Sequence, residues 1–247
     1  MLKLFLVAMM VPLVVAAPAK TQKTVVLVHG AFSDGSSWDK VIPLLQAKGL
    51  RVVAVQNPLT SLADDVAATK RAIDAQGGPV ILVGHSWGGT VITEAGAHDK
   101  VAALVYVAAF APDAGQSSND LGKGEAPAPG LANIRPDSAG FLTLTPESVA
   151  ANFAQDLPAA ETAVMAVTQG PIAGKAFDDK VGNAAWKTKP SWFIVSEKDR
   201  MIQPDLERAM ARKINARTTA LPTSHVPMLS RPNDVGAVIL AAAEAVQ

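Results

Sequence analysis

The chain contains no cysteine, and this excludes disulfides, thiolate metal sites and a cysteine nucleophile. It also lacks an excess of either charge, because 22 Lys and Arg residues balance 22 Asp and Glu residues. Without a basic cluster, the sequence predicts no binding to nucleic acid and none to an anionic membrane surface. It contains no H-E-x-x-H motif, no histidine cluster and no Walker-type loop. We therefore expect a protein that uses neither a metal nor a cofactor.

The N-terminus has the layout of a secretory signal peptide. Lys3 precedes an apolar run at residues 4–15, and small residues follow, so that cleavage after Ala16 or Ala19 is expected. The run is shorter than the ~20 residues that a typical membrane-spanning helix needs. Removal of residues 1–19 would leave a periplasmic or secreted protein without a stable membrane anchor. The alternative is a hydrophobic terminus that packs on the core.

The remaining residues, 20–247, predict one α/β domain. Apolar residues make up 49% of the chain, enough for a sizeable core. Short apolar runs rich in β-branched residues predict strands at 23–28, 51–55, 79–83, 101–107, 191–196 and 217–221. Between them, apolar residues recur at helical spacing at 38–45, 62–73, 206–214 and 235–242. Continuously apolar strands that alternate with helices predict a doubly wound, mostly parallel sheet.

The segment between the fourth and fifth of these strands interrupts the alternation. Residues 111–189 are rich in proline and glycine, and their second half shows only weak helical patterns, at 147–155 and 159–169. A long excursion between two strands is usually a functional loop or a lid. We therefore expect a small helical cap, inserted after the fourth mature strand, that covers the ends of the strands.

The candidate nucleophile is Ser86, within Gly84-His85-Ser86-Trp87-Gly88-Gly89. This G-x-S-x-G pattern follows the predicted strand at 79–83 and precedes a helix that is expected to begin near Thr90. A sharp turn from strand to helix strains its central residue and presents that side chain to solvent, and the flanking glycines relieve the crowding. The simpler alternative is a glycine-rich turn that only packs the helix on the strand.

A serine hydroxyl needs a base to take its proton, and the chain has 4 histidines. His225 lies in a loop just after the last predicted strand, where it can reach over the strand ends. His85 is next to Ser86 but should point away from the tip of the turn, and His98 lies at the end of the following helix. His29 ends the first mature strand. His225 is therefore the predicted base, with a surface-loop histidine as the alternative.

The base in turn needs a carboxylate that fixes its tautomer and stabilises the imidazolium. Asp199 directly follows the predicted strand at 191–196, within SEKDRMI, and is the predicted acid. Glu197 lies two residues earlier, and Asp113 follows the predicted strand at 101–107. Both remain open as alternatives, as does a role for Asp199 in capping a turn.

Two backbone N–H groups are expected to form an oxyanion hole. The loop His29-Gly30-Ala31-Phe32 leaves the first mature strand near the nucleophile turn. The N–H groups of Ala31 and Trp87 can then converge on a developing negative oxygen. The side chains of Phe32 and Trp87 lie beside these donors in the sequence and are predicted to contact substrate.

The segments VVLVHGAFSDGSSW, VILVGHSWGG and SEKDRMI, the last followed by PTSH, resemble the α/β-hydrolase superfamily. They are most similar to its small members related to plant hydroxynitrile lyases, methyl-ester esterases of plant signals and bacterial pyrethroid-type esterases. The order Ser86, Asp199, His225 is the order of triad residues in this fold. The resemblance implies a cofactor-free Ser-His-Asp enzyme that acts on a small, fairly apolar ester under a modest lid.

Two departures from the lyase pattern favour ester hydrolysis over cyanohydrin cleavage. The hydroxynitrile lyases carry a threonine directly after the first-strand histidine and a lysine after the catalytic one. This chain has Gly30 and Val226 at those positions. The alternatives that remain open are a lyase, a ligand-binding protein that kept the triad, and a cofactor-free perhydrolase.

Overall fold

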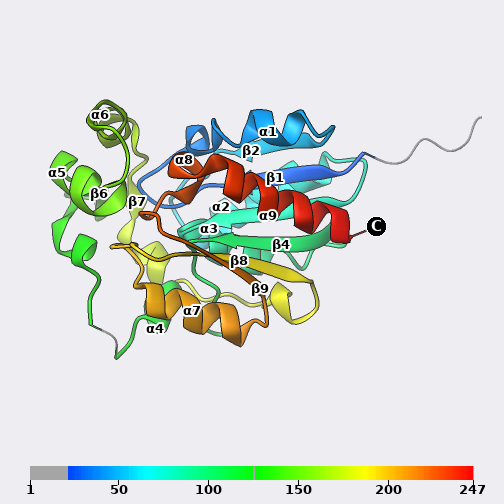
Figure 1. The fold of residues 1–247 in the computed structure, drawn as a ribbon. Helices are drawn as coiled ribbons and strands as arrows, with labels where there is room; N and C mark the ends of the chain where they lie inside the picture. Colours follow the sequence, from blue (N-terminus) through cyan, green and yellow to red (C-terminus); the bar gives the residue numbers. More distant parts are fainter. Residues whose placement is uncertain (1–21, 125, 247) are drawn as a thin grey trace, which may run out of the picture.

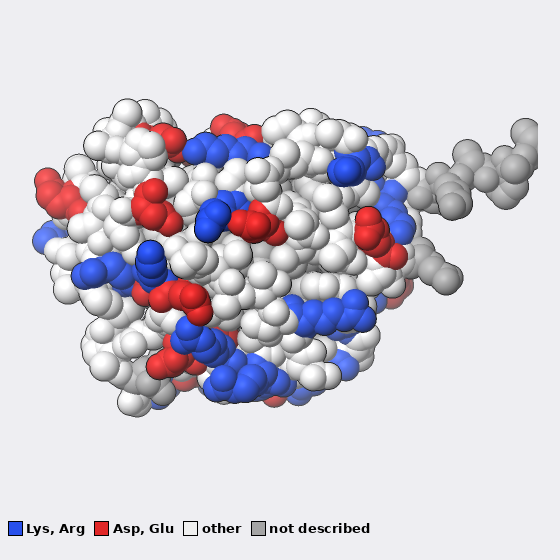
Figure 2. All heavy atoms as spheres, in the orientation of Figure 1, with Lys and Arg blue, Asp and Glu red and all other residues white. Residues whose placement is uncertain are grey.

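The computed structural model describes residues 22–124 and 126–246 (Figure 1). The predicted signal peptide, residues 1–19, lies outside the described residues, so its prediction stands as an expectation. Within the described part of the chain, none of the helices has the length and apolar character needed to cross a membrane. Figure 2 shows basic and acidic side chains scattered over one face and adjacent to one another in several places, in keeping with the balanced composition.

The centre of the molecule is a six-stranded sheet in the order β2-β1-β3-β4-β8-β9, and every pair of neighbouring strands is parallel. Its strands are β1 (Thr24–Val28), β2 (Arg51–Val55), β3 (Val80–His85), β4 (Val101–Val107), β8 (Ser191–Ser196) and β9 (Arg217–Leu221). These bounds confirm the strands predicted from the apolar runs. The inner strands β1 and β3 are buried along their whole length, as expected of a parallel sheet that is covered on both faces.

Helices cover both faces of the sheet. The main ones are α1 (Ile42–Gln46), α2 (Leu62–Asp74), α3 (Trp87–Ala95), α7 (Pro204–Lys213), α8 (Pro227–Ser230) and α9 (Pro232–Ala245). Because crossovers between parallel strands are right-handed, α1 and α2 lie on opposite faces. Helix α9 packs with α1 in front of the sheet, and α2 packs with α3 behind it (Figure 1). Ser61 starts α2 as its N-cap, since its side chain accepts the N–H of Asp64.

The direction of winding reverses between β1 and β3. The chain leaves β1 towards β2 at one edge of the sheet, whereas it leaves β3 towards β4 and the opposite edge. In open parallel sheets this reversal leaves a crevice at the carboxyl ends of the two strands, where ligands bind. The loops that follow β1 and β3 contain Ala31 and Ser86, so the topology alone brings these two residues to the crevice.

The middle of the connection from β4 to β8, with α5, α6, β6 and β7, lies at the end of the molecule opposite the C-terminus (Figure 1). The helices of this connection are α4 (Ser118–Leu121), α5 (Pro146–Ser148) and α6 (Ala159–Thr168), with a π-helical turn at Val149–Phe153. The prediction of a helical cap missed a three-stranded antiparallel sheet of β5 (Ile134–Pro136), β6 (Phe141–Leu144) and β7 (Ile172–Ala173). Strands of this length are too short to show an alternating pattern in the sequence.

Candidate active site

Ser86 forms the turn between β3 and α3, and its backbone is strained. Its φ of 53° and ψ of −121° lie in a region that residues with a Cβ rarely adopt. The flanking glycines permit the turn, because a Cβ on Gly84 would lie 2.5 Å from the Gly88 carbonyl oxygen. A Cβ on Gly88 would lie 2.5 Å from the carbonyl oxygen of Val28. Helix α3 begins at Trp87, directly after the turn and earlier than the predicted start near Thr90.

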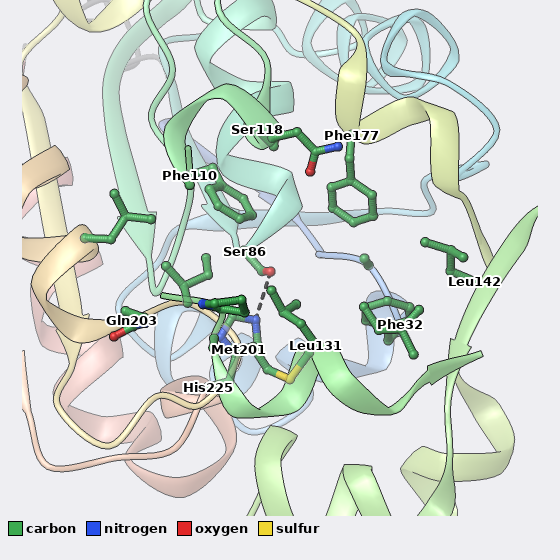
Figure 3. Close-up of a pocket in the computed structure, with 18 of the residues that line it drawn as sticks. Phe32, Ser86, Phe110, Ser118, Leu131, Leu142, Phe177, Met201, Gln203 and His225 are labelled. Carbon is green, nitrogen blue, oxygen red and sulfur yellow. Dashed lines mark hydrogen bonds between the residues drawn. The ribbon is translucent and has the colours of Figure 1, made fainter. Parts of the chain in front are cut away.

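His225 and Asp199 extend from Ser86 as a chain of hydrogen bonds. The Nε2 atom of His225 lies 2.8 Å from Ser86 Oγ, a bond drawn as a dashed line in Figure 3. On the other side of the ring, His225 Nδ1 lies 2.5 Å from Asp199 Oδ2. All three residues are buried, with exposed fractions of 7% for Ser86, 6% for Asp199 and 1% for His225. This geometry lets the histidine take the serine proton while the carboxylate fixes its tautomer.

The turn after β8 holds the carboxylate of Asp199 in place. Its Oδ1 atom accepts the backbone N–H groups of Met201 at 2.6 Å and Ile202 at 2.9 Å. Two backbone donors on one oxygen fix the orientation of the carboxyl group. Asp199 therefore faces His225 with one oxygen while the protein backbone anchors the other.

The alternative acids and bases lie elsewhere. Asp113 pairs with Lys187 at 2.5 Å, and hydrogen bonding to that lysine lowers the pKa of its carboxyl group. Glu197 pairs with Arg208 at the surface, and His98 lies 2.8 Å from Asp74. The structure therefore brings none of these groups to Ser86.

His85 packs against His225. Its Nε2 atom lies 2.8 Å from the backbone carbonyl oxygen of His225, and its ring centre lies 4.8 Å from that of His225. Burial, together with the neighbouring His225, holds the pKa of His85 well below its usual range. The neutral ring then donates its Nε2–H to the carbonyl, which ties the loop of His225 to the strand that precedes Ser86.

The two predicted oxyanion donors lie at the carboxyl ends of β1 and β3. Trp87 is the first residue of α3, so its N–H has no acceptor within the helix. The N–H of Ala31 donates to no acceptor among residues 22–124 and 126–246. His29 anchors the loop, because its Nε2 accepts the Asn57 N–H at 2.9 Å. Both donors are thus available to a developing oxyanion beside Ser86.

Replacing Gly30 with alanine should lower kcat about 10- to 1,000-fold. A Cβ at this position would lie 2.7 Å from Ser86 Cβ and 3.0 Å from the His85 carbonyl oxygen, so the loop that carries Ala31 must move. Displacement of one oxyanion donor costs about 10²–10³-fold in kcat. Steady-state kinetics on a p-nitrophenyl ester measures the loss. Gly77→Ala is the matched control, since nothing lies within 4 Å of a Cβ at that position. Equal kcat in the two variants would contradict the placement of the loop.

The side chain of Trp87 corrects a prediction. It is fully buried, donates its Nε1–H to Asp65 Oδ2 at 2.8 Å, and packs edge-on against Phe177. It does not line the cavity beside Ser86, because α3 begins at Trp87 and directs this side chain towards α2. Phe32, by contrast, lines the cavity, and Figure 3 shows its ring there. Its contact with substrate stays a prediction.

The cavity between the nucleophile and the cap has a volume of about 420 Å³, within the ~300–1,000 Å³ range of small-molecule sites. Figure 3 shows apolar side chains from both sides of the site. The cap supplies Leu131, Leu142 and Phe177, and the α/β domain supplies Phe32, Phe110 and Met201. Lys123 is the one lysine or arginine among the described lining residues, and it lies 2.5 Å from Asp120.

Sequence reasoning missed two buried carboxyl groups near this site, Asp65 and Glu207. Asp65 accepts the indole N–H of Trp87 and the backbone N–H of Leu59, both at 2.8 Å, and burial raises its pKa to about 6. Its position between Leu62 and Val66 on the apolar face of α2 was the available signal, because a carboxyl group on that face must find buried donors.

The chain matches the model of the alpha/beta hydrolase family over residues 25–238. It is 27% identical to probable hydrolase R7 of Phoma sp. over 89% of this chain and 97% of that one. It is 29% identical to methylesterase 3 of Arabidopsis thaliana over 87% and 94% of the two chains. A crystal structure of the pyrethroid hydrolase PytH superposes with a TM-score of 0.79, at 24% identity over 91% and 98%. The chain therefore belongs to the alpha/beta hydrolase family.

Proposed function

We propose that this protein is a serine esterase that cleaves small, uncharged carboxylic esters with apolar groups. The observation that carries the proposal is the hydrogen-bonded chain Ser86–His225–Asp199 at the base of an apolar cavity. A nucleophile, a base and an orienting carboxylate in this geometry are the parts that acyl transfer requires. The relatives named as a methylesterase and a pyrethroid hydrolase agree with this reaction class.

The first half-reaction acylates Ser86. His225 Nε2 takes the serine proton as Ser86 Oγ attacks the ester carbonyl, and Asp199 stabilises the imidazolium that forms. The carbonyl oxygen becomes an oxyanion, which accepts hydrogen bonds from the N–H groups of Ala31 and Trp87. When the tetrahedral intermediate collapses, the bond to the leaving alkoxy group breaks and His225 gives its proton to the departing alcohol.

The second half-reaction releases the acid. Water enters the place of the alcohol, gives a proton to His225 Nε2 and attacks the acyl carbonyl. The same oxyanion donors stabilise the second intermediate. When it collapses, the bond to Ser86 Oγ breaks and His225 returns the proton to the serine. Both half-reactions therefore need a neutral His225 whose Nε2 atom is free to take a proton.

The lining of the cavity supports an uncharged, apolar substrate. The charge of Lys123 is already paired with Asp120. The other side chains that face the cavity from the cap and the α/β domain are mainly aliphatic or aromatic. Transferring an ionised group into such a site without a partner is costly, whereas each buried methylene contributes about 0.8 kcal/mol.

The lack of space for a side chain at Gly30 argues against cyanohydrin cleavage, the main alternative reaction. The lyase pattern places a threonine at this position, but a Cβ there would lie 2.7 Å from Ser86 Cβ. Real Cβ atoms do not approach so closely without displacing the backbone. The loop of this chain therefore has no room for the threonine of the lyases, and hydrolysis is the better supported reaction.

Chain-length selectivity should follow the volume of the cavity. Along the p-nitrophenyl esters from acetate to laurate, kcat/KM should rise up to about fourfold per methylene and then fall once the cavity is full. Leu142→Ala, which shortens a cap side chain that lines the cavity, should move the optimum to longer esters. The control is Val167→Ala on α6, a side chain that is 82% exposed and outside the cavity. An identical optimum in all three proteins would show that this cavity does not hold the acyl chain.

A further inference from the structure

A second carboxyl group lies behind Asp199. Glu207 is on α7, and its side chain is fully buried, with an exposed fraction of 0%. Its Oε2 atom accepts the backbone N–H of Ser196 at 2.9 Å, at the end of β8. Its Oε1 atom receives a hydrogen bond from no donor in the described part of the chain. Since Ser196 stands three residues before Asp199, this bond places the Glu207 carboxyl group beside the turn that holds Asp199.

The hydrogen bonds of Asp199 leave room for one more donor. A carboxylate offers about four lone-pair sites. His225 Nδ1 and the N–H groups of Met201 and Ile202 occupy three of them. A carboxylic O–H on Glu207 would fill the fourth, and it would also give the unpartnered Oε1 atom its hydrogen bond.

The charges around Glu207 favour its neutral form. Arg208 is the neighbouring cation, but it is turned outward, to Glu197 at 3.3 Å and Asp205 at 2.9 Å. His225 contacts Asp199 through its Nδ1 atom. Two ionised carboxylates in contact in the interior would repel each other without a cation between them. Burial and the charge of Asp199 raise the pKa of Glu207 well above its usual range.

We propose that Glu207 is a positioning residue that remains a neutral carboxylic acid and donates its O–H to the Asp199 carboxylate. This hydrogen bond fixes the rotation of Asp199 and, through it, the ring of His225. The neutral acid adds no second negative charge beside the base. The kinetic part of this inference rests on the proposed function, in which Asp199 orients His225.

Glu207→Gln tests the proposal, because an amide can accept the Ser196 N–H and donate to Asp199. We expect kcat/KM within about threefold of the wild type and an unchanged midpoint of the acid limb of the pH–rate profile. Glu207→Leu, which has no donor, should lower kcat/KM about 10- to 100-fold. If Glu207 were ionised, Glu207→Gln would remove a negative charge near His225. It would then move the midpoint of the acid limb down by about one pH unit or more, which would overturn the proposal.

The pH dependence of the free energy of unfolding also shows whether Glu207 is protonated, and it requires no activity assay. The folded protein keeps the Glu207 proton, whereas the unfolded chain releases it above the ordinary value of 4.5. The native state therefore binds more protons, and the wild type loses stability relative to Glu207→Gln as the pH rises. We expect the ratio of their unfolding constants to change by about tenfold per pH unit above that value, in urea titrations.

The control for the stability measurement is Asp205→Asn, the same change on the same helix at an exposed side chain. The free energy of unfolding of this variant should change with pH in parallel with that of the wild type. Parallel curves for the wild type and Glu207→Gln would show that Glu207 is ionised when folded and would refute the proposal. Because unfolding requires no substrate, this result is independent of whether the protein proves to be an esterase.

Discussion

Replacing Ser86 with alanine should lower kcat for ester hydrolysis about a millionfold, because the nucleophile is lost while the rest of the site stays in place. Alanine keeps the Cβ that already occupies the strained turn at φ 53°, so the backbone changes little. What remains is catalysis by the oxyanion donors and by substrate binding. Initial rates on p-nitrophenyl butyrate, measured with purified wild type and variant, give the ratio.

Two further measurements make the Ser86→Ala result decisive. Thermal unfolding should show a midpoint close to that of the wild type, which separates loss of the nucleophile from loss of the fold. Ser138→Ala, at an exposed serine in the turn between β5 and β6, should keep full activity. Turnover by Ser86→Ala at a rate comparable to the wild type would assign the hydrolysis to another group.

The second large effect is expected for Asp199→Asn, which should lower kcat about 10⁴-fold. An amide facing His225 Nδ1 can donate to that nitrogen, and the ring then carries its proton on Nε2. Nε2 can no longer accept the Ser86 proton, although the shape of the site is kept. KM should change far less than kcat, because Asp199 does not line the cavity.

The other two acidic residues that the sequence left open supply the controls for this variant. Asp113→Asn breaks an ion pair with Lys187, and Glu197→Gln breaks one with Arg208. Exposed ion pairs contribute about 0–1 kcal/mol, so both variants should fold and keep near-normal kcat. A loss of activity in either one that matches the loss in Asp199→Asn would move the role of the acid away from Asp199.

The sequence predicted those parts of the molecule in which a local sequence pattern is compatible with only one local structure. Strands buried on both faces must be continuously apolar, and the runs at 24–28 and 101–107 show this directly. Glycine is required on both sides of Ser86, because a Cβ at Gly84 or Gly88 would lie 2.5 Å from a backbone carbonyl oxygen. The motif therefore indicates a turn with a fixed geometry. Once this fold is expected, the carboxyl ends of the strands determine where Asp199 and His225 lie.

The parts that could not be predicted depend on the direction of a side chain or on contacts distant in sequence. Trp87 follows the nucleophile, but only the start of α3 shows that its indole points to Asp65 on α2. The cap sheet pairs β6 with β7 across residues 141–173, and neither strand has a pattern of its own. Glu207 looks like a surface residue of a charged helix until α7 is placed against β8.

The most direct test of the central claim is to label the nucleophile covalently and locate the label. The protein is incubated with an uncharged ethyl p-nitrophenyl alkylphosphonate, which phosphonylates an activated serine and releases p-nitrophenolate. The modified protein is then digested and analysed by mass spectrometry. We predict one phosphonyl group per chain, on the peptide that contains Ser86, and no labelling of the Ser86→Ala variant. Labelling at another residue, or no labelling of a wild-type protein that hydrolyses esters, would contradict a covalent mechanism at Ser86.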